Sequence, residues 1–160
     1  MNDKLVVGIA DMKMAQGSGM LVTYALGSCI GICFYDPMLK LAALLHIMLP
    51  LNLETGRKSP LKYADTGIRE TLREMERRGA KRARVTAKIA GGAQMFAAIT
   101  NSSISNIGQR NIAAVKETLA KLRIPIIADD TGKNYGRTLY FNAADGTMRI
   151  KSVNRGEWVW

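Results

Sequence analysis

The sequence contains little cysteine and almost no histidine. Its 160 residues include two cysteines, Cys29 and Cys33, and one histidine, His46. Two cysteines four positions apart provide neither a disulfide framework nor a four-ligand zinc site. In a strand they would share a face but lie too far apart to bond without bending the backbone. We therefore expect two free thiols, no structural metal and a reducing compartment.

Long apolar runs are also missing. No stretch reaches the roughly 20 consecutive apolar residues of a membrane-spanning helix. The longest candidate, Leu41 to Leu51, contains His46 and Pro50, and we interpret it as a buried strand. The opening residues Met1 to Lys4 lack the basic start and apolar segment of a secretory signal. These absences predict a cytoplasmic protein without membrane insertion.

Aromatic residues make up only 6% of the chain, whereas 23 basic residues outnumber 13 acidic ones and give a net charge of +10. A surface of this charge attracts polyanions. The basic residues are not interleaved with aromatics and no known binding motif is present, so we do not expect a nucleic acid partner. The charge leaves two alternatives open, an acidic protein partner or a solvated basic face.

The length and the 48% hydrophobic content indicate one folded domain spanning residues 1–160. Apolar, β-branched runs bounded by turn residues predict several short strands. Turns are expected at Gly17 to Gly19, Asp36-Pro37 and Asp145-Gly146. The predicted strands cover Leu5–Ile9, Met20–Leu26, Cys29–Tyr35, Leu41–Leu49, Ala83–Ile89, Ile124–Ala128, Arg137–Asn142 and Met148–Val153.

Two amphipathic helices are predicted, separated from the early strands by a loop over residues 51–61. The first follows Asp65 as N-cap and ends at Gly79, and the second runs from about Asn111 through Leu122 until Pro125. Strands before Asp65 are too closely spaced for helical crossovers, so we expect antiparallel pairs. The pattern predicts an α+β layered sandwich, in which two principal helices pack on a mixed, largely antiparallel sheet.

The sequence Gly27-Ser28-Cys29 interrupts the strand pattern with two small residues before a thiol. A thiol on such a turn is surrounded by backbone N–H groups that can stabilise an oxyanion, as acyl transfer requires. Gly27 and Ser28 are therefore candidate oxyanion or substrate-binding residues. A free cysteine between apolar neighbours is more often a small core residue, so Cys29 alone does not establish catalysis.

His46 changes this interpretation. It follows Cys29 by 17 residues, a spacing that would bring the two together in a hairpin, whereas Cys33 is closer to the turn. An imidazole in an apolar strand needs a polar partner, which could be a thiolate or, more commonly, a backbone carbonyl. A paired imidazolium would lower the pKa of the Cys29 thiol. Thr23 could orient the base, although it is equally well interpreted as an ordinary strand residue.

The segment Thr23 to Cys29, followed by Leu45 to Pro50, resembles the signature of the chemoreceptor glutamine deamidases, the CheD family. The departures from the family pattern are Lys133, where a second glycine is common, and a variable loop from Leu51 to Pro60. The resemblance covers nearly the whole chain, in order, through Lys62–Asp65, Lys88–Phe96, Ile107–Asn111 and Asp130–Arg137.

This resemblance implies hydrolysis of selected glutamines of methyl-accepting chemotaxis receptors to glutamate, with release of ammonia and no cofactor. It implies a layered fold shared with glutamine-deamidating toxins, with Cys29 as nucleophile, His46 as base and Thr23 as third member. The implied partners are the chemoreceptor cytoplasmic helical bundle, as substrate, and a CheC-type chemotaxis phosphatase, as regulator. A non-catalytic adaptor that activates this phosphatase is the alternative, and a basic RNA-binding module is a more distant one.

Gly91-Gly92 follows a predicted strand but lacks the Gly-Lys-Ser/Thr continuation of a P-loop, so nucleotide binding is not expected. We interpret the pair as a close backbone approach near the active centre. Six further polar residues could shape a substrate cleft or close turns, and the sequence leaves both roles open for Arg110, Asn111, Asp130, Thr131, Asn134 and Arg137.

Overall fold

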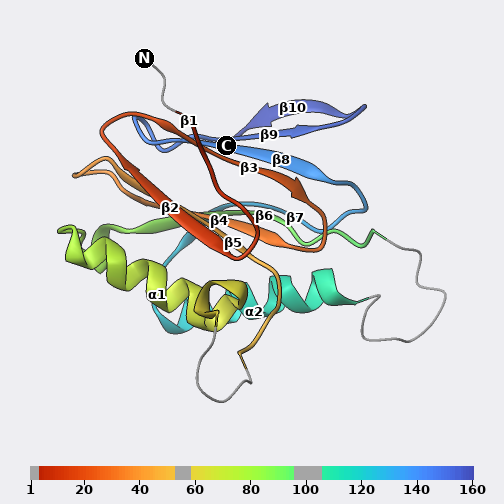
Figure 1. Cartoon of the computed structure of the whole chain (residues 1–160), viewed down its shortest axis with the longest axis horizontal. Helices are drawn as coiled ribbons and strands as arrows, with labels where there is room; N and C mark the ends of the chain where they lie inside the picture. Colours follow the sequence, from red (N-terminus) through yellow and green to blue (C-terminus); the bar gives the residue numbers. More distant parts are fainter. Residues whose placement is uncertain (1–3, 53–58, 96–105) are drawn as a thin grey trace.

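The computed structural model describes residues 4–52, 59–95 and 106–160, which fold into three layers, two stacked β-sheets and a layer of helices (Figure 1). The upper sheet contains, in spatial order, β1 (Lys4–Val6), β3 (Met20–Leu26), β8 (Arg137–Asn142), β9 (Met148–Ser152) and β10 (Gly156–Val159). The lower sheet contains β2 (Asp11–Gln16), β5 (Leu41–Ile47), β4 (Ile30–Asp36), β6 (Thr86–Gly91) and β7 (Ile126–Thr131).

The helices α1 (Ala64–Arg77) and α2 (Ile107–Lys121) cover the outer face of the lower sheet (Figure 1). Two short 3-10 helices, η1 (Pro60–Lys62) and η2 (Arg82–Arg84), precede α1 and β6. The parallel pairs are β1 with β3 and β6 with β7, and the other strand pairs are antiparallel. The predicted α+β layered class, with two principal helices and largely antiparallel pairing, is confirmed, although the strands divide between two sheets.

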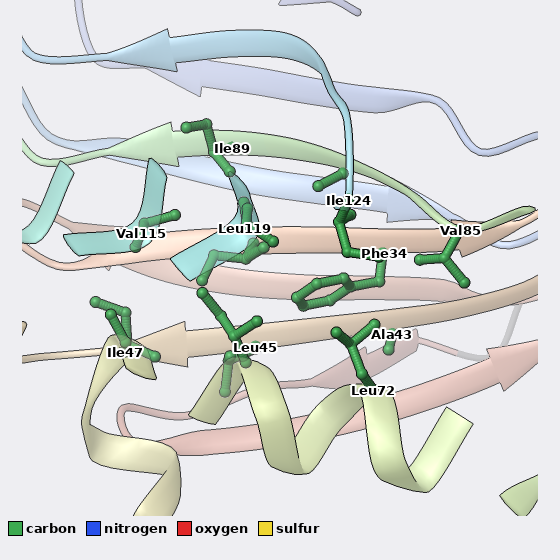
Figure 2. Packing of buried hydrophobic residues seen from close by; sticks show 14 of the residues in the cluster. Phe34, Ala43, Leu45, Ile47, Leu72, Val85, Ile89, Val115, Leu119 and Ile124 are labelled. Atoms are coloured by element: carbon green, nitrogen blue, oxygen red, sulfur yellow. The ribbon is translucent and has the colours of Figure 1, made fainter. Parts of the chain in front are cut away.

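The central strands β4 and β5 of the lower sheet are buried on both faces, which explains their nearly continuous apolar sequences. Phe34, Leu45 and Ile47 belong to the cluster that packs against α1 and α2, together with Leu72 and Leu119 (Figure 2). The alternate residues face the upper sheet and form a second cluster, which includes Cys33, Ala42, Leu44, Leu139 and Phe141. This alternation leaves the layer between the sheets for the side chain of His46.

Two strands were not predicted. β2 has no β-branched residue, and β10 is a short edge strand that begins at Gly156. β1 ends at Val6 rather than Ile9, because the chain turns before β2 and Ala10 adopts a φ of 58°. The antiparallel hairpin of β8 and β9 around Asp145-Gly146 is confirmed.

The element ends differ by a few residues from the predictions. Tyr63 rather than Asp65 is the N-cap of α1; the Asp65 carboxylate instead accepts a hydrogen bond from the Thr66 N–H within the first turn. The second helix begins at Ile107, four residues before the predicted start at Asn111. The prediction missed this first turn because Gly108 and Gln109 carry no apolar periodicity. Strand β6 starts later than predicted, after η2, and β7 is displaced toward Thr131.

Parts of the sequence predictions lie outside the described residues: positions 1–3, residues 53–58 of the expected loop, and Phe96 in the CheD resemblance. Within the described part of the chain, no helix is long and apolar enough to cross a membrane.

Candidate active site

The β4–β5 hairpin places Cys29 and His46 at the same end of the lower sheet. The predicted antiparallel pairing is confirmed, with Ile30 opposite Ile47 and Gly31 opposite His46. Opposed residues share a face, and Cys29 stands two residues before Gly31, in the bend that leads into β4. Cys29 packs against the cluster between the two sheets, and His46 is fully buried. The two side chains are therefore brought to one region of the interlayer space.

Thr23 reaches His46 from the other sheet. Its Oγ1 lies 2.7 Å from His46 Nδ1 and 2.7 Å from the carbonyl oxygen of Val7. A carbonyl only accepts hydrogen bonds, so the Thr23 hydroxyl donates to Val7, and Nδ1 must carry the proton that it donates to Oγ1. This network selects the Nδ1–H tautomer of the neutral imidazole and leaves a lone pair on Nε2.

The Nε2 atom of His46 is buried and has no hydrogen-bond partner among the described residues. Burial lowers the pKa of His46 from 6.5 to about 4, and the charge of Asp11 opposes this shift. The imidazole is therefore neutral at neutral pH. A buried, unpartnered nitrogen with a free lone pair has the chemical character of a general base.

Asp11 is a site residue that the sequence did not indicate. It lies opposite His46 in the β2–β5 pairing. Its carboxylate accepts hydrogen bonds from the Gly8 N–H at 3.2 Å and the Met12 N–H at 2.8 Å. Because β2 carries no clear strand pattern, no local signal could have placed this carboxylate beside a histidine 35 residues later.

The Cys29 thiol is free and partly buried. Burial raises its pKa above the ordinary value, while its own backbone N–H lowers it. The expectation that a paired imidazolium lowers this pKa is therefore wrong for the resting site. A neutral His46 supplies no positive charge, and its Nε2 forms no hydrogen bond with the thiol. The thiol and the imidazole both rest uncharged.

The bend over residues 27–29 is fixed through hydrogen bonds to its carbonyl groups. The three bonds run from the Ala93 N–H to Gly27 O (2.8 Å), from Asn111 Nδ2 to Ser28 O (2.9 Å) and from the Gly92 N–H to Cys29 O (2.9 Å). In a trans peptide, the N–H of the next residue points away from the carbonyl, so these bonds turn the N–H groups of Ser28 and Cys29 away from β6 and α2. Neither N–H donates to another described residue.

The Gly91-Gly92 pair is a close backbone approach beside the cysteine, as predicted. A Cβ at Gly91 would lie 2.2 Å from the carbonyl oxygen of Cys29, and one at Gly92 would lie 2.5 Å from Ile112. Both glycines have positive φ, 110° and 68°. Only glycine therefore allows β6 to approach the bend this closely.

Asn111 and Arg137, whose roles the sequence left open, are both buried near this bend. Asn111 Nδ2 also donates to the carbonyl of Met48, at 3.0 Å, so one side chain joins the cysteine bend to the segment after β5. Arg137 Nε lies 3.4 Å from the Asp130 carboxylate, which also accepts a 2.9 Å hydrogen bond from the Trp158 indole. Asn111 therefore supports the bend itself, whereas Arg137 joins β8 to the Asp130 carboxylate of β7.

The other open residues have less connection to the bend. Thr131 Oγ1 donates to the carboxylate of Asp129, and Asn134 lines a surface cavity. Arg110 is exposed on α2. Within residues 4–52, 59–95 and 106–160, no group of three or more His, Cys, Asp or Glu side chains is placed to hold a metal ion.

Comparison with known proteins agrees with the resemblance found in the sequence. A family model described as CheD chemotactic sensory transduction matches residues 48–152. The chain belongs to the CheD family. The matched segment begins two residues after His46, so the arrangement of Thr23, Cys29 and His46 rests on the geometry of β3, β4 and β5.

Several CheD relatives align over nearly the whole chain, and three are each named "Probable chemoreceptor glutamine deamidase CheD". The protein from Caldanaerobacter subterraneus subsp. tengcongensis is 51% identical over 95% of this chain and 94% of its own length. That from Syntrophomonas wolfei is 49% identical over 98% of both chains. That from Lachnoclostridium phytofermentans is 46% identical over 97% of both.

One solved structure is similar to part of this chain. The crystal structure of the Bacillus licheniformis hypothetical protein YfiH has a TM-score of 0.42 and 14% sequence identity, covering 70% of this chain and 46% of the other.

Proposed function

We propose that this chain is a protein-glutamine deamidase that hydrolyses selected glutamines of chemoreceptors to glutamate and releases ammonia. The names of the relatives that align over nearly the whole chain support the reaction and the substrate class. The single structural observation that carries the proposal is the buried, unpartnered Nε2 of His46, whose Nδ1 is held by Thr23. Cys29 is the nucleophile, His46 the general base and Thr23 the residue that orients the base.

The resting pair is a neutral thiol and a neutral imidazole, so the base acts when the substrate arrives. His46 Nε2 takes the Cys29 proton as the sulfur attacks the glutamine side-chain carbonyl carbon. The imidazolium then gives that proton to the amide nitrogen, and ammonia leaves a thioester. Water attacks the thioester as it gives a proton to His46. The carbon–sulfur bond then breaks and the imidazolium returns this proton to the departing sulfur, so that glutamate and the Cys29 thiol are formed. The balance is glutamine plus water to glutamate plus ammonia.

The negative charge that develops on the substrate oxygen is stabilised by the backbone of the bend. The N–H groups of Ser28 and Cys29 are the candidate donors, because the carbonyls of Gly27 and Ser28 are anchored on the opposite side. The Cys29 N–H already acts on its own sulfur, since it lowers the pKa of that thiol. Removal of one such donor reduces the turnover number by about 100- to 1,000-fold in other enzymes.

The net charge of +10 suits a substrate that carries many carboxylates, such as the cytoplasmic helical bundle of a chemoreceptor. The chain would then act in the cytoplasm. A CheC-type chemotaxis phosphatase is the regulator that the family resemblance suggests. Neither cofactor nor metal enters the proposed reaction.

The test is to incubate a chemoreceptor cytoplasmic fragment with the wild type, Cys29→Ala and His46→Ala. Ammonia release and mass spectrometry then report which glutamines gain the mass of a deamidation. The wild type should convert specific glutamines and both variants should not. Cys33→Ala is the matched control, because Cys33 is a buried thiol three residues into β4 with no place in the reaction.

If several receptor fragments remain unconverted while the chain binds a CheC-type phosphatase, the adaptor function replaces the deamidase. Under that outcome Cys29→Ala would bind the phosphatase as the wild type does. Circular dichroism of each variant separates loss of chemistry from loss of fold.

A further inference from the structure

A surface cavity of about 740 Å³ adjoins the cysteine bend. Gly92, which lines the cavity, donates its N–H to the carbonyl of Cys29 at 2.9 Å. Met95, on the same wall, has its Cγ 3.2 Å from the position of a Cβ on Gly27. Gly92, one of the residues that anchor the bend, is therefore also part of the cavity wall, and Met95 of this wall lies beside Gly27. A substrate that presents a side chain to Cys29 has this cavity beside it.

The cavity wall is polar and positively charged. Lys133, Arg155, Gln94, Asn134 and Tyr135 are among its residues, and no described Asp or Glu lines it. Neither Lys133 nor Arg155 forms an ion pair with another described residue. The two cations are thus unneutralised and face a space large enough for several side chains. Their chemistry fits carboxylates.

The wall is also built on a rigid support. The guanidinium carbons of Arg137 and Arg155 each lie 4.6 Å from the centre of the Tyr135 ring. Tyr135 in turn meets the edge of Trp158, at a centroid distance of 6.3 Å and an interplanar angle of 89°. Arg137 is buried on the Asp130 carboxylate. Arg155 is therefore held above a preorganised aromatic surface rather than left free in solvent.

Lys133 has an unusual backbone conformation for its residue type. Its φ is 63°, in the left-handed region where glycine is unstrained and other residues are strained. Its carbonyl accepts a hydrogen bond from the Gln94 N–H at 2.9 Å, which ties this turn to the segment after β6. The turn that carries Lys133 is therefore fixed to the cavity wall.

We propose that this cavity is a subsite for carboxylate side chains that flank the target glutamine, with Lys133 and Arg155 as the residues that select them. The proposal rests on the deamidase function proposed above. It names the feature that distinguishes one substrate glutamine from another, namely acidic residues close to it in space.

Two synthetic peptides test the subsite. One carries a single glutamine among glutamates, and its twin has a serine at each glutamate position. With the wild type, the KM of the acidic peptide should be lower by about tenfold, and the difference should shrink as salt rises. Lys133→Gly and Arg155→Ala should each raise the KM of the acidic peptide about three- to tenfold, with kcat and the KM of the serine twin nearly unchanged.

Lys133→Gly also relieves the backbone, so loss of fold cannot explain its effect. Lys40→Gly is the matched control, since Lys40 is an exposed lysine with a φ of 49° in the turn between β4 and β5. This control should leave both KM values unchanged. Equal KM values for the two peptides, or equal effects of Lys133→Gly and Lys40→Gly, would overturn the subsite.

Failure of the subsite and failure of the deamidase can be told apart. Binding of both peptides to Cys29→Ala, measured by fluorescence anisotropy, does not depend on turnover. A preference for the acidic peptide that Lys133→Gly removes supports the subsite even if the wild type releases no ammonia. Turnover of both peptides at equal KM, with equal binding to Cys29→Ala, supports the deamidase and rejects the subsite.

Discussion

Thr23 and His46 belong to different sheets, yet their side chains lie 2.7 Å apart between the two layers. The hydroxyl is itself anchored on the Val7 carbonyl at 2.7 Å, in the segment between β1 and β2. The base is therefore oriented by the stacking of the sheets, and not by the hairpin that carries it. The stacking of the two sheets therefore determines which nitrogen of His46 carries the proton.

Replacement of Thr23 by valine should separate orientation from packing. Valine keeps the shape but cannot accept the Nδ1 proton, so we expect kcat to fall about 10- to 100-fold. It also leaves the buried Val7 carbonyl unpaired, which should lower the free energy of unfolding by about 1–3 kcal/mol. Thr23→Ser restores the hydroxyl and should recover most of kcat. Steady-state kinetics and urea unfolding measure the two effects, and equal kcat values for the two variants would contradict the role.

The buried His46 should make stability depend on pH. Its pKa is about 4 in the fold and near 6.5 when exposed, so the unfolded chain binds the proton first as pH falls. The contribution of neutral His46 is intact above about pH 6.5 and is lost progressively down to pH 4. At 1.36 kcal/mol per pKa unit, the loss in the free energy of unfolding approaches about 3 kcal/mol. His46→Gln should lack this component, as urea unfolding at pH 8, 6 and 4.5 would reveal; parallel curves for both proteins would reject it.

Asp11 should tune the base through its charge. Its carboxylate favours the imidazolium, so Asp11→Asn should lower the pKa of His46 further. The acid limb of the kcat/KM profile, where His46 becomes protonated, should then move to lower pH, and kcat should fall because the imidazolium intermediate is less stable. Glu117→Gln, an exposed carboxylate on α2, should leave the limb in place. A limb that does not move in Asp11→Asn would assign Asp11 a purely structural role.

Much of the fold follows from local patterns in the sequence. The apolar runs of β3 and β8 are predicted to the residue, and the β4–β5 hairpin follows from Asp36-Pro37 between two such runs. The division into two sheets could not be predicted, because strand-to-sheet assignment depends on pairings such as β3 with β8, over 100 residues apart. β2 was missed for a related reason, since its strand conformation depends on pairing with β5 rather than on the β propensity of its own residues.

The candidate site shows the same limit. The spacing of Cys29 and His46 predicts that the hairpin brings them together, because both lie near one end of adjacent strands. The raised pKa of the thiol could not be predicted, because it depends on burial between layers that the sequence does not place. Asp11 and the anchoring carbonyl of Val7 were missed, since each acts through contacts across strands that no spacing reveals.

Gly91 offers a direct test of how closely the scaffold supports the nucleophile. Gly91→Ala would bring a Cβ within 2.2 Å of the Cys29 carbonyl, which must move and take the bend with it. Gly17→Ala is the matched control, because Gly17 also has a positive φ, 80°, but has no atom within 4 Å of its Cβ position. In the control, the free energy of unfolding should fall only by the strain of an alanine in the left-handed region, about 1–2 kcal/mol, and activity should be unchanged.

Gly91→Ala should lose more stability than this and at least about tenfold in kcat, because the displaced carbonyl no longer sets the direction of the backbone at the thiol. Thermal unfolding and ammonia release from a receptor fragment measure both quantities. If the two variants lose equal stability and both keep full activity, the approach of β6 does not position Cys29, and the N–H groups of the bend must be fixed by Ala93 and Asn111.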